Sequence, residues 1–158
     1  MFEDLLAANR RYAAKFHDSG VAGSAAKGLA VLTCIDSRID PLAMLGLIPG
    51  DAKIIRNAGA RVTDDALRSL VLAVNLLNVS RICVVQHTDC AMAKNSDEQI
   101  RAALKADAEF EPLAMPDQFA ALREDIARIV ASRYIPSTTQ VGGFMFDVKT
   151  GELVPAAI

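Results

Sequence analysis

The sequence contains no tryptophan, only two histidines and only three cysteines among 158 residues. An odd number of cysteines argues against a disulfide framework, so we expect reduced thiols, as in a cytosol. The N-terminal residues lack the basic and apolar regions of a signal peptide. The longest apolar stretch, at residues 70–79, is interrupted by Asn75 and is too short to span a bilayer. We therefore expect a cytoplasmic protein that makes no use of a membrane.

The sequence also has little excess of one charge over the other. The net charge is −2, with acidic and basic residues interspersed, so no basic face for nucleic acid is expected. Hydrophobic residues make up 52% of the chain and charged residues 23%, which is typical of a globular protein. The length fits one domain, residues 1–158, in which residues 1–17 form an N-terminal helical arm. A small molecule is the expected substrate.

Short apolar runs alternate with helical patterns along the chain, which favours an α/β fold. We expect a mainly parallel central sheet flanked by helices, with an N-terminal helix arm and a C-terminal hairpin. Ligands of such sheets bind beyond the carboxyl ends of the strands. The expected strands are 28–34, 52–56 and 81–87, the expected helices are 2–16, 64–77 (N-capped by Thr63) and 116–134, and the hairpin spans 141–154.

Three potential metal ligands stand at the ends of two expected strands. Cys34 closes the first strand, His87 closes the third, and Cys90 follows three residues later. Two thiolates and an imidazole suit Zn²⁺, and three protein ligands leave one position open for catalysis. A single cysteine in an apolar strand is usually a core residue. We apply that interpretation to Cys83.

A carboxylate and a guanidinium follow the first ligand closely. Asp36 and Arg38 lie two residues apart in the loop after Cys34. There, Asp36 can accept a hydrogen bond from a metal-bound hydroxide or bind the metal itself, and Arg38 can hold it as an oriented anion. The alternative is a solvated loop ion pair of little energetic value.

Three motifs, in their order and spacing, resemble β-class carbonic anhydrases of the short bacterial branch. They are Cys34-Ile-Asp-Ser-Arg38, Arg56-Asn-Ala-Gly59 and His87-Thr-Asp-Cys90. The similarity extends to the helix after Gly59 and to the hairpin from Phe146 to Gly151, and so spans nearly the whole chain. The resemblance implies one Zn²⁺ per chain, held by Cys34, His87 and Cys90.

The resemblance also implies what the remaining residues do. Asp36 and Arg38 would form the catalytic dyad, and Gly59 would let the backbone approach the substrate pocket. The reaction would be reversible hydration of carbon dioxide to bicarbonate and a proton, by attack of zinc-bound hydroxide, as in a carbonate dehydratase (a lyase). The other histidine, His17, is expected to be solvent-exposed and not to shuttle protons.

Two alternatives to this function stay open. Relatives with the same motifs hydrolyse carbonyl sulfide or carbon disulfide. A non-catalytic zinc protein with a closed fourth position is the other alternative, although it would not need the dyad. One position departs from the family pattern: Ala91 stands where a glycine usually follows the second cysteine. If that position requires positive φ, we expect Ala91 to be strained by about 1 kcal/mol.

The N-terminal helix carries an apolar face but is separated from the sheet by a stretch rich in glycine and serine, 18–28. This face must be buried somewhere, and the stretch allows the helix to reach a neighbouring subunit. The resemblance points the same way, since it implies an active site at a subunit interface. We therefore expect a homodimer, with pairing of dimers into a tetramer as a further step. The apolar residues are Phe2, Leu5, Leu6, Ala13 and Phe16.

Overall fold

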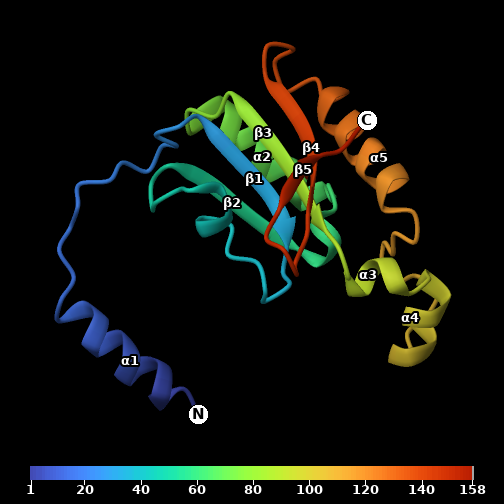
Figure 1. The fold of residues 1–158 in the computed structure, drawn as a ribbon, viewed down its shortest axis with the longest axis horizontal. Coiled ribbons are helices and arrows are strands. Elements are labelled where there is room, and N and C mark those ends of the chain that lie inside the picture. Colours follow the sequence, from blue (N-terminus) through green and yellow to red (C-terminus); the bar gives the residue numbers. More distant parts are fainter. Residues whose placement is uncertain (158) are drawn as a thin grey trace.

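The computed structural model describes residues 1–157 and has a five-stranded sheet at its centre (Figure 1). The strand order is β2-β1-β3-β4-β5, in which four strands are parallel and the last is antiparallel. The expected α/β class with a mainly parallel sheet is confirmed. The strands are β1 (Leu29–Cys34), β2 (Ala52–Asn57), β3 (Arg81–His87), β4 (Gln140–Phe146) and β5 (Leu153–Pro155).

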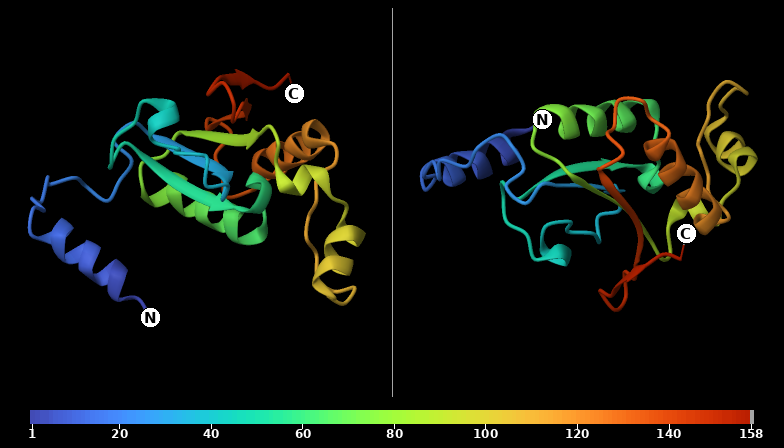
Figure 2. Two further views of the ribbon diagram at one scale, coloured as in Figure 1. Left: turned by 60° about the horizontal axis from the view of Figure 1, so that its bottom comes forward. Right: turned by 90° about the horizontal axis from the view of Figure 1, so that it is seen from above.

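Two long helices, α2 (Asp64–Leu76) and α5 (Gln118–Val130), cover one face of the sheet. Leu70 from α2 and Leu122 from α5 lie in one buried cluster with Leu32 of β1. The opposite face is covered by shorter segments, which include the single turn η1 (Ala43–Leu45), on the other side of the sheet from α2 (Figure 2). The core therefore lies in two layers, one on each side of the sheet.

The ends of α2 and α5 follow from their capping residues. Thr63 caps α2 as expected, with its hydroxyl accepting a hydrogen bond from the Ala66 backbone N–H at 3.3 Å. Helix α5 begins after Asp117, which occupies its N-cap and accepts from the Ala120 N–H, and it ends at Val130, so it is shorter than the expected 116–134. The C-terminal hairpin forms as expected, and its first strand also pairs with β3.

Two helices and two single turns, of which η1 is one, were not expected from the sequence. The turn η2 (Ala58–Ala60) follows β2, and α3 (Ala91–Lys94) and α4 (Asp97–Leu104) follow β3. Helix α4 has a capping box in which Ser96 and Gln99 exchange side-chain to backbone hydrogen bonds. The spacing of that pair was the available sequence signal for this helix.

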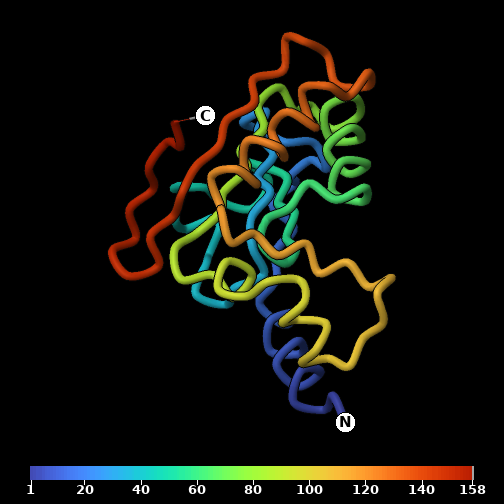
Figure 3. The backbone as a smooth tube through the Cα atoms, turned by 90° about the vertical axis from the view of Figure 1, so that its right-hand side faces the viewer, coloured from blue at the N-terminus to red at the C-terminus, as the bar shows by residue number. Residues whose placement is uncertain are grey.

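Helix α1 (Glu3–Ala13) stands away from the sheet at the end of a long connection (Figures 1 and 3). None of its residues is buried within the described chain. Phe2, Leu5, Leu6 and Phe16 are each between 56% and 64% exposed. The apolar face predicted for this helix therefore lacks a partner among residues 1–157.

The cap of α2 allows a direct test of the fold. We expect Thr63→Val to lower the free energy of unfolding by about 1 kcal/mol, because the isosteric side chain cannot accept the Ala66 hydrogen bond. Thr63→Ser keeps the hydroxyl and should stay close to wild type. Urea unfolding at one fixed protein concentration measures both, and equal losses in the two variants would contradict the role of the cap.

Candidate active site

Three sulfur and nitrogen side chains meet at the carboxyl ends of β1 and β3. These strands are adjacent and parallel, so Cys34 at the end of one lies beside His87 at the end of the other. Cys90 returns to the same point from the turn after β3. The Sγ and ring-nitrogen atoms of the three residues all lie within 4.8 Å of one another, and all three residues are buried.

The tautomer of His87 fits a metal ligand. Its Nδ1 lies 2.9 Å from the carbonyl oxygen of Thr88, so Nδ1 carries the proton and donates it. Its Nε2 is buried and has no hydrogen-bond partner among the described residues. A buried nitrogen lone pair beside two thiols is costly unless a cation fills the space between them. The donor set therefore fits Zn²⁺, as expected from the sequence.

The two thiols do not behave alike. The neighbouring Cys90 thiol lowers the pKa of Cys34, and the same interaction raises the pKa of Cys90. The two sulfur atoms therefore lie close to each other in the site. A divalent cation bound there would hold both as thiolates, because metal binding requires deprotonated thiols.

Gly59 approaches the first ligand through its backbone. Its N–H donates to the Sγ of Cys34 at 3.4 Å, which favours the thiolate form of that ligand. Gly59 has a φ of +77°, and a Cβ at this position would lie 2.9 Å from the Cε of Met115. The left-handed backbone favours glycine here, and an added Cβ would also displace the end of the Met115 side chain.

Asp36 and Arg38 form a bidentate ion pair beside the ligands. Arg38 donates from Nε to Oδ1 at 2.9 Å and from Nη2 to Oδ2 at 2.7 Å, and its backbone N–H donates to the same carboxylate. These hydrogen bonds hold the pKa of Asp36 well below its usual range. The Asp36 Oδ2 lies 3.9 Å from the Nε2 of His87, so the carboxylate is adjacent to the triad.

The loop that carries this pair is held by Arg56. Its guanidinium donates to the carbonyl oxygen of Cys34 at 2.9 Å and to that of Asp36 at 2.8 Å. Arg56 belongs to one of the motifs quoted from the sequence, but its contact with this loop was not predicted. Asp89, between the two ligands of the third motif, was also not assigned, although it contacts Arg38.

The condition for strain at Ala91, a positive φ at that position, is not met. Ala91 is the first residue of α3 and is not among the residues with a left-handed backbone. The left-handed conformation in this turn occurs two residues earlier, at Asp89, with a φ of 61°. Aspartate tolerates this conformation better than most residues, so the turn closes without a glycine at position 91.

The two remaining thiol and imidazole groups lie outside the site. Cys83 is partly buried and packs against the core on the side of η1 and α3, as the sequence suggested. Burial raises the pKa of its thiol, so it is a poor nucleophile. His17 is exposed in the connection after α1.

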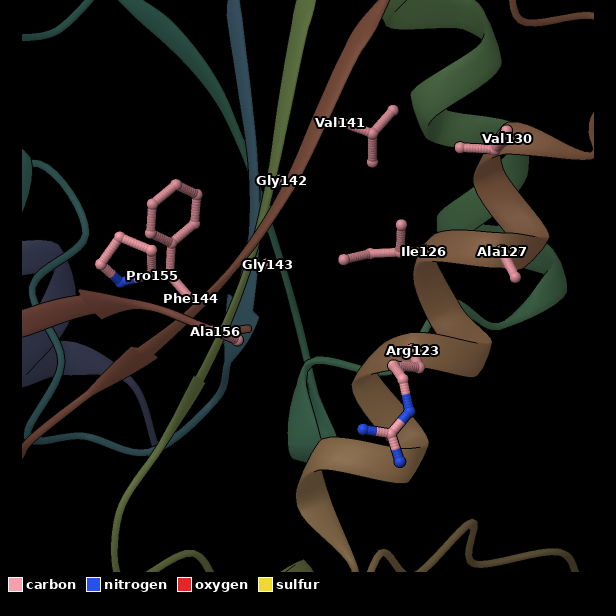
Figure 4. A pocket seen from close by; sticks show the side chains of 10 residues that line it. All are labelled: Arg123, Ile126, Ala127, Val130, Val141, Gly142, Gly143, Phe144, Pro155 and Ala156. Carbon is pink, nitrogen blue, oxygen red and sulfur yellow. The ribbon is translucent and has the colours of Figure 1, made fainter. Parts of the chain in front are cut away.

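A hollow of about 530 Å³ lies elsewhere, between α5 and β4–β5 (Figure 4). Its walls are apolar side chains such as Ile126 and Phe144, and Arg123 is its single charged residue. None of the three metal-ligand candidates lines it. Without a nucleophile or a metal ligand it lacks the groups for hydration chemistry, so the triad remains the candidate active site.

Comparison with known proteins agrees with this geometry. A family model described as carbonic anhydrase matches residues 29–108, which include all three ligand candidates. Over 155 residues the chain is 36% identical to β-carbonic anhydrase 1 of Mycobacterium tuberculosis, covering 96% of this chain and 94% of that protein. The chain belongs to the β-carbonic anhydrase family. Zinc is therefore the expected metal of the triad.

Similarity to solved structures gives the same family. The carbonic anhydrase of Streptococcus mutans superposes with a TM-score of 0.89 at 36% identity, covering 98% of this chain and 96% of that one. A carbon disulfide hydrolase of Acidianus is 49% identical over 72 residues, which are 46% of this chain and 35% of that protein. A solved carbon disulfide hydrolase covers 99% of this chain with a TM-score of 0.75 at 26% identity, so the carbonic anhydrases differ by their higher identity over the full chain and not by coverage.

Zinc content should separate the ligand cysteine from the core cysteine. We expect about one zinc per chain in the purified protein, a marked loss in Cys90→Ser, and unchanged content in the control Cys83→Ser. Elemental analysis after exhaustive dialysis provides the measurement. Equal zinc content in Cys90→Ser and wild type would rule out Cys90 as a ligand.

Proposed function

We propose that this protein catalyses the reversible hydration of carbon dioxide to bicarbonate and a proton, as a zinc-dependent carbonate dehydratase. The observation that carries the proposal is the bidentate Asp36–Arg38 pair beside a buried triad of Cys34, His87 and Cys90. Zn²⁺ held by that triad would make water a nucleophile near neutral pH. Two thiolate ligands balance the metal charge and leave one coordination position open.

The protein groups orient the reaction. Asp36 lies beside the triad and accepts hydrogen bonds, so its carboxylate directs the lone pair of the attacking oxygen toward the carbon of the substrate. Arg38 keeps Asp36 ionised and turned away from the ligand atoms. A new carbon–oxygen bond forms, the product is bicarbonate, and the proton leaves to solvent. His17 takes no part, because it lies in the exposed connection after α1.

The Asp36–Arg38 geometry also argues against the non-catalytic alternative. A structural zinc site is closed by a fourth protein ligand, and such a site needs no oriented carboxylate nearby. Here the carboxylate nearest the triad is engaged by three hydrogen bonds from Arg38. Asp36 is therefore held as a hydrogen-bonding group, and the fourth position stays available to water and substrate.

Hydrolysis of carbonyl sulfide or carbon disulfide is the second candidate function. It is favoured by the 49% identity to a carbon disulfide hydrolase, although that match covers 46% of the chain. All three substrates are linear and electrophilic, and the same groups would act on each. Side-by-side turnover assays with carbon dioxide, carbonyl sulfide and carbon disulfide distinguish these functions. We propose that carbon dioxide is the preferred substrate.

The exposed apolar face of α1 supports assembly through this helix. We propose a homodimer, with further pairing into a tetramer, in which α1 packs on the neighbouring subunit. The main body also exposes apolar side chains that a partner can cover, among them Leu76 at 72% and Val130 at 65%. Burying both surfaces would contribute several kcal/mol, at about 25 cal/mol per Å² of apolar area. In this arrangement residues 1–17 are the arm of a single domain, 1–158.

We propose a cytoplasmic location, because the thiols that would bind the metal need a reducing environment. Two of the three cysteines serve as metal ligands, and these must stay reduced to bind. Within residues 1–157, no helix has the length and apolar character needed to cross a bilayer.

The dyad is tested by replacing its guanidinium. We expect Arg38→Ala to lower kcat/KM for carbon dioxide by about 100-fold at pH 7, because a carboxylate that is free to rotate no longer orients the nucleophile. Zinc content should stay at about one per chain. Stopped-flow hydration assays provide the rate, and near-full turnover of Arg38→Ala would contradict the role proposed for this residue.

Assembly is tested by removing the apolar face of α1. Deletion of residues 1–16, or the milder Leu5→Gln/Leu6→Gln pair, should weaken self-association and lower activity. The control Arg10→Gln/Arg11→Gln alters exposed residues of the same helix and should stay oligomeric. Sedimentation velocity at micromolar concentration distinguishes the outcomes. A fully active wild-type monomer would rule out this assembly.

A further inference from the structure

Arg38 is held by two carboxylates that come from different strand ends. On one side it binds Asp36 through Nε and Nη2. On the other side its Nη1 donates to the Oδ2 of Asp89 at 2.8 Å, and its Nη2 donates to the Asp89 carbonyl oxygen at 3.2 Å. The guanidinium therefore connects the loop after β1 to the turn after β3.

The position of Asp89 is itself well determined. It lies between the candidate ligands His87 and Cys90, with a left-handed φ of 61°. The residue before it, Thr88, is tied to the hairpin by two hydrogen bonds, from its N–H to Phe146 O at 2.9 Å and from Val148 N–H to its hydroxyl at 3.1 Å. The turn thus presents the Asp89 carboxylate to Arg38 in one place.

Lys94, at the end of α3, completes the arrangement. Its ammonium pairs with Oδ1 of Asp89, while Oδ2 accepts from Arg38. Both oxygens of Asp89 are therefore engaged by cations, and the residue lies outside the cluster of ligand atoms. Asp89 therefore does not bind the metal, although it lies between the candidate ligands His87 and Cys90 in the sequence.

We propose that Asp89, supported by Lys94, is a positioning residue that fixes Arg38 and thereby keeps Asp36 directed away from the metal. Asp36 Oδ2 is only 3.9 Å from the Nε2 of His87, so this carboxylate lies within reach of the space that the three ligand atoms face. The Arg38 backbone N–H also restrains Asp36, but a guanidinium anchored only to Asp36 could still move together with that carboxylate. Asp89 supplies the second anchor.

The exposure of the Arg38–Asp89 ion pair indicates that it orients Arg38 and adds little to the stability of the fold. The side chains of Arg38 and Asp89 are 42% and 38% exposed, and ion pairs this exposed contribute little to folding. Loss of the contact should therefore change the site and leave the stability of the protein nearly unaltered. The inference rests on the proposed function, since it concerns the same metal position.

The test replaces zinc by Co²⁺, whose visible absorption reports the coordination of the metal. In the wild-type cobalt protein, added thiocyanate should bind the open position and change the spectrum. In Asp89→Gly, which accommodates the left-handed turn, Asp36 should occupy that position. We expect thiocyanate affinity and kcat/KM for carbon dioxide to fall by about 10- to 100-fold. Cobalt content should stay at about one per chain, and the melting temperature should stay within about 2 °C.

Two further variants isolate the cause. Asp89→Asn keeps an acceptor oxygen for Arg38 and should recover part of both losses. Asp65→Asn breaks an exposed pair with Arg68, at 2.7 Å on the surface of α2, and should behave as wild type. In Asp36→Asn/Asp89→Gly the thiocyanate response should return, because the carboxylate that closes the site has been removed.

The outcomes separate this inference from the proposed function. Full thiocyanate response and full turnover in Asp89→Gly would overturn the inference alone. Loss of cobalt from both Asp89 variants would also overturn it, because Asp89 would then maintain the ligand turn and not Arg38. A wild-type protein that binds neither cobalt nor thiocyanate would contradict the proposed function together with the inference.

Discussion

The parallel pairing of β1 with β3 is the contact on which the site depends. Its register runs from Leu29 opposite Arg81 to Thr33 opposite Val85, so the two strands end together with Cys34 and His87 adjacent. Thr33 reinforces the pairing through a hydrogen bond from its hydroxyl to the Val85 carbonyl at 3.0 Å. A slip of one residue would turn one ligand to the other face of the sheet.

Around this contact the charges are arranged in opposing pairs. Two thiols and an imidazole face the space that suits a divalent cation, and Asp36 stands beside them under the control of Arg38. Arg38 also forms an ion pair with Asp89, and Asp89 forms a second ion pair with Lys94. Each group thus has a counter-charge that fixes its direction. In the proposed mechanism the direction of the Asp36 carboxylate decides whether the metal position is open, so the surrounding ion pairs would act on function more than on stability.

The sequence was sufficient for the elements with strong periodicity. The apolar runs that end in Cys34 and His87 predict two strands and the edge of the sheet where they meet, because parallel strands share their carboxyl ends. The Thr63 cap and the apolar stripe of α2 were equally clear. Short elements were missed: α3 has four residues, too few for any periodic pattern, and α4 was marked only by its capping box.

Contacts between loops could not be derived from spacing. Asp89 and Arg38 are 51 positions apart, and their meeting depends on the left-handed turn at Asp89, which only the fold reveals. The question of strain at Ala91 also depended on the fold, because the left-handed residue of the turn lies two positions earlier. Local sequence predicts that a turn exists there, but the residue that carries the unusual φ depends on the hairpin bonded to Thr88.

We propose that a single metal ion at the Cys34, His87 and Cys90 site makes this protein a carbon dioxide hydratase. Stripping the protein of metal with a chelator and titrating zinc back, while the hydration rate is followed by stopped flow, tests this directly. No activity above background is expected in the stripped protein. The rate should then rise linearly and reach a plateau at about one zinc per chain. Full hydration activity in the stripped protein, with chelator still present, would contradict it.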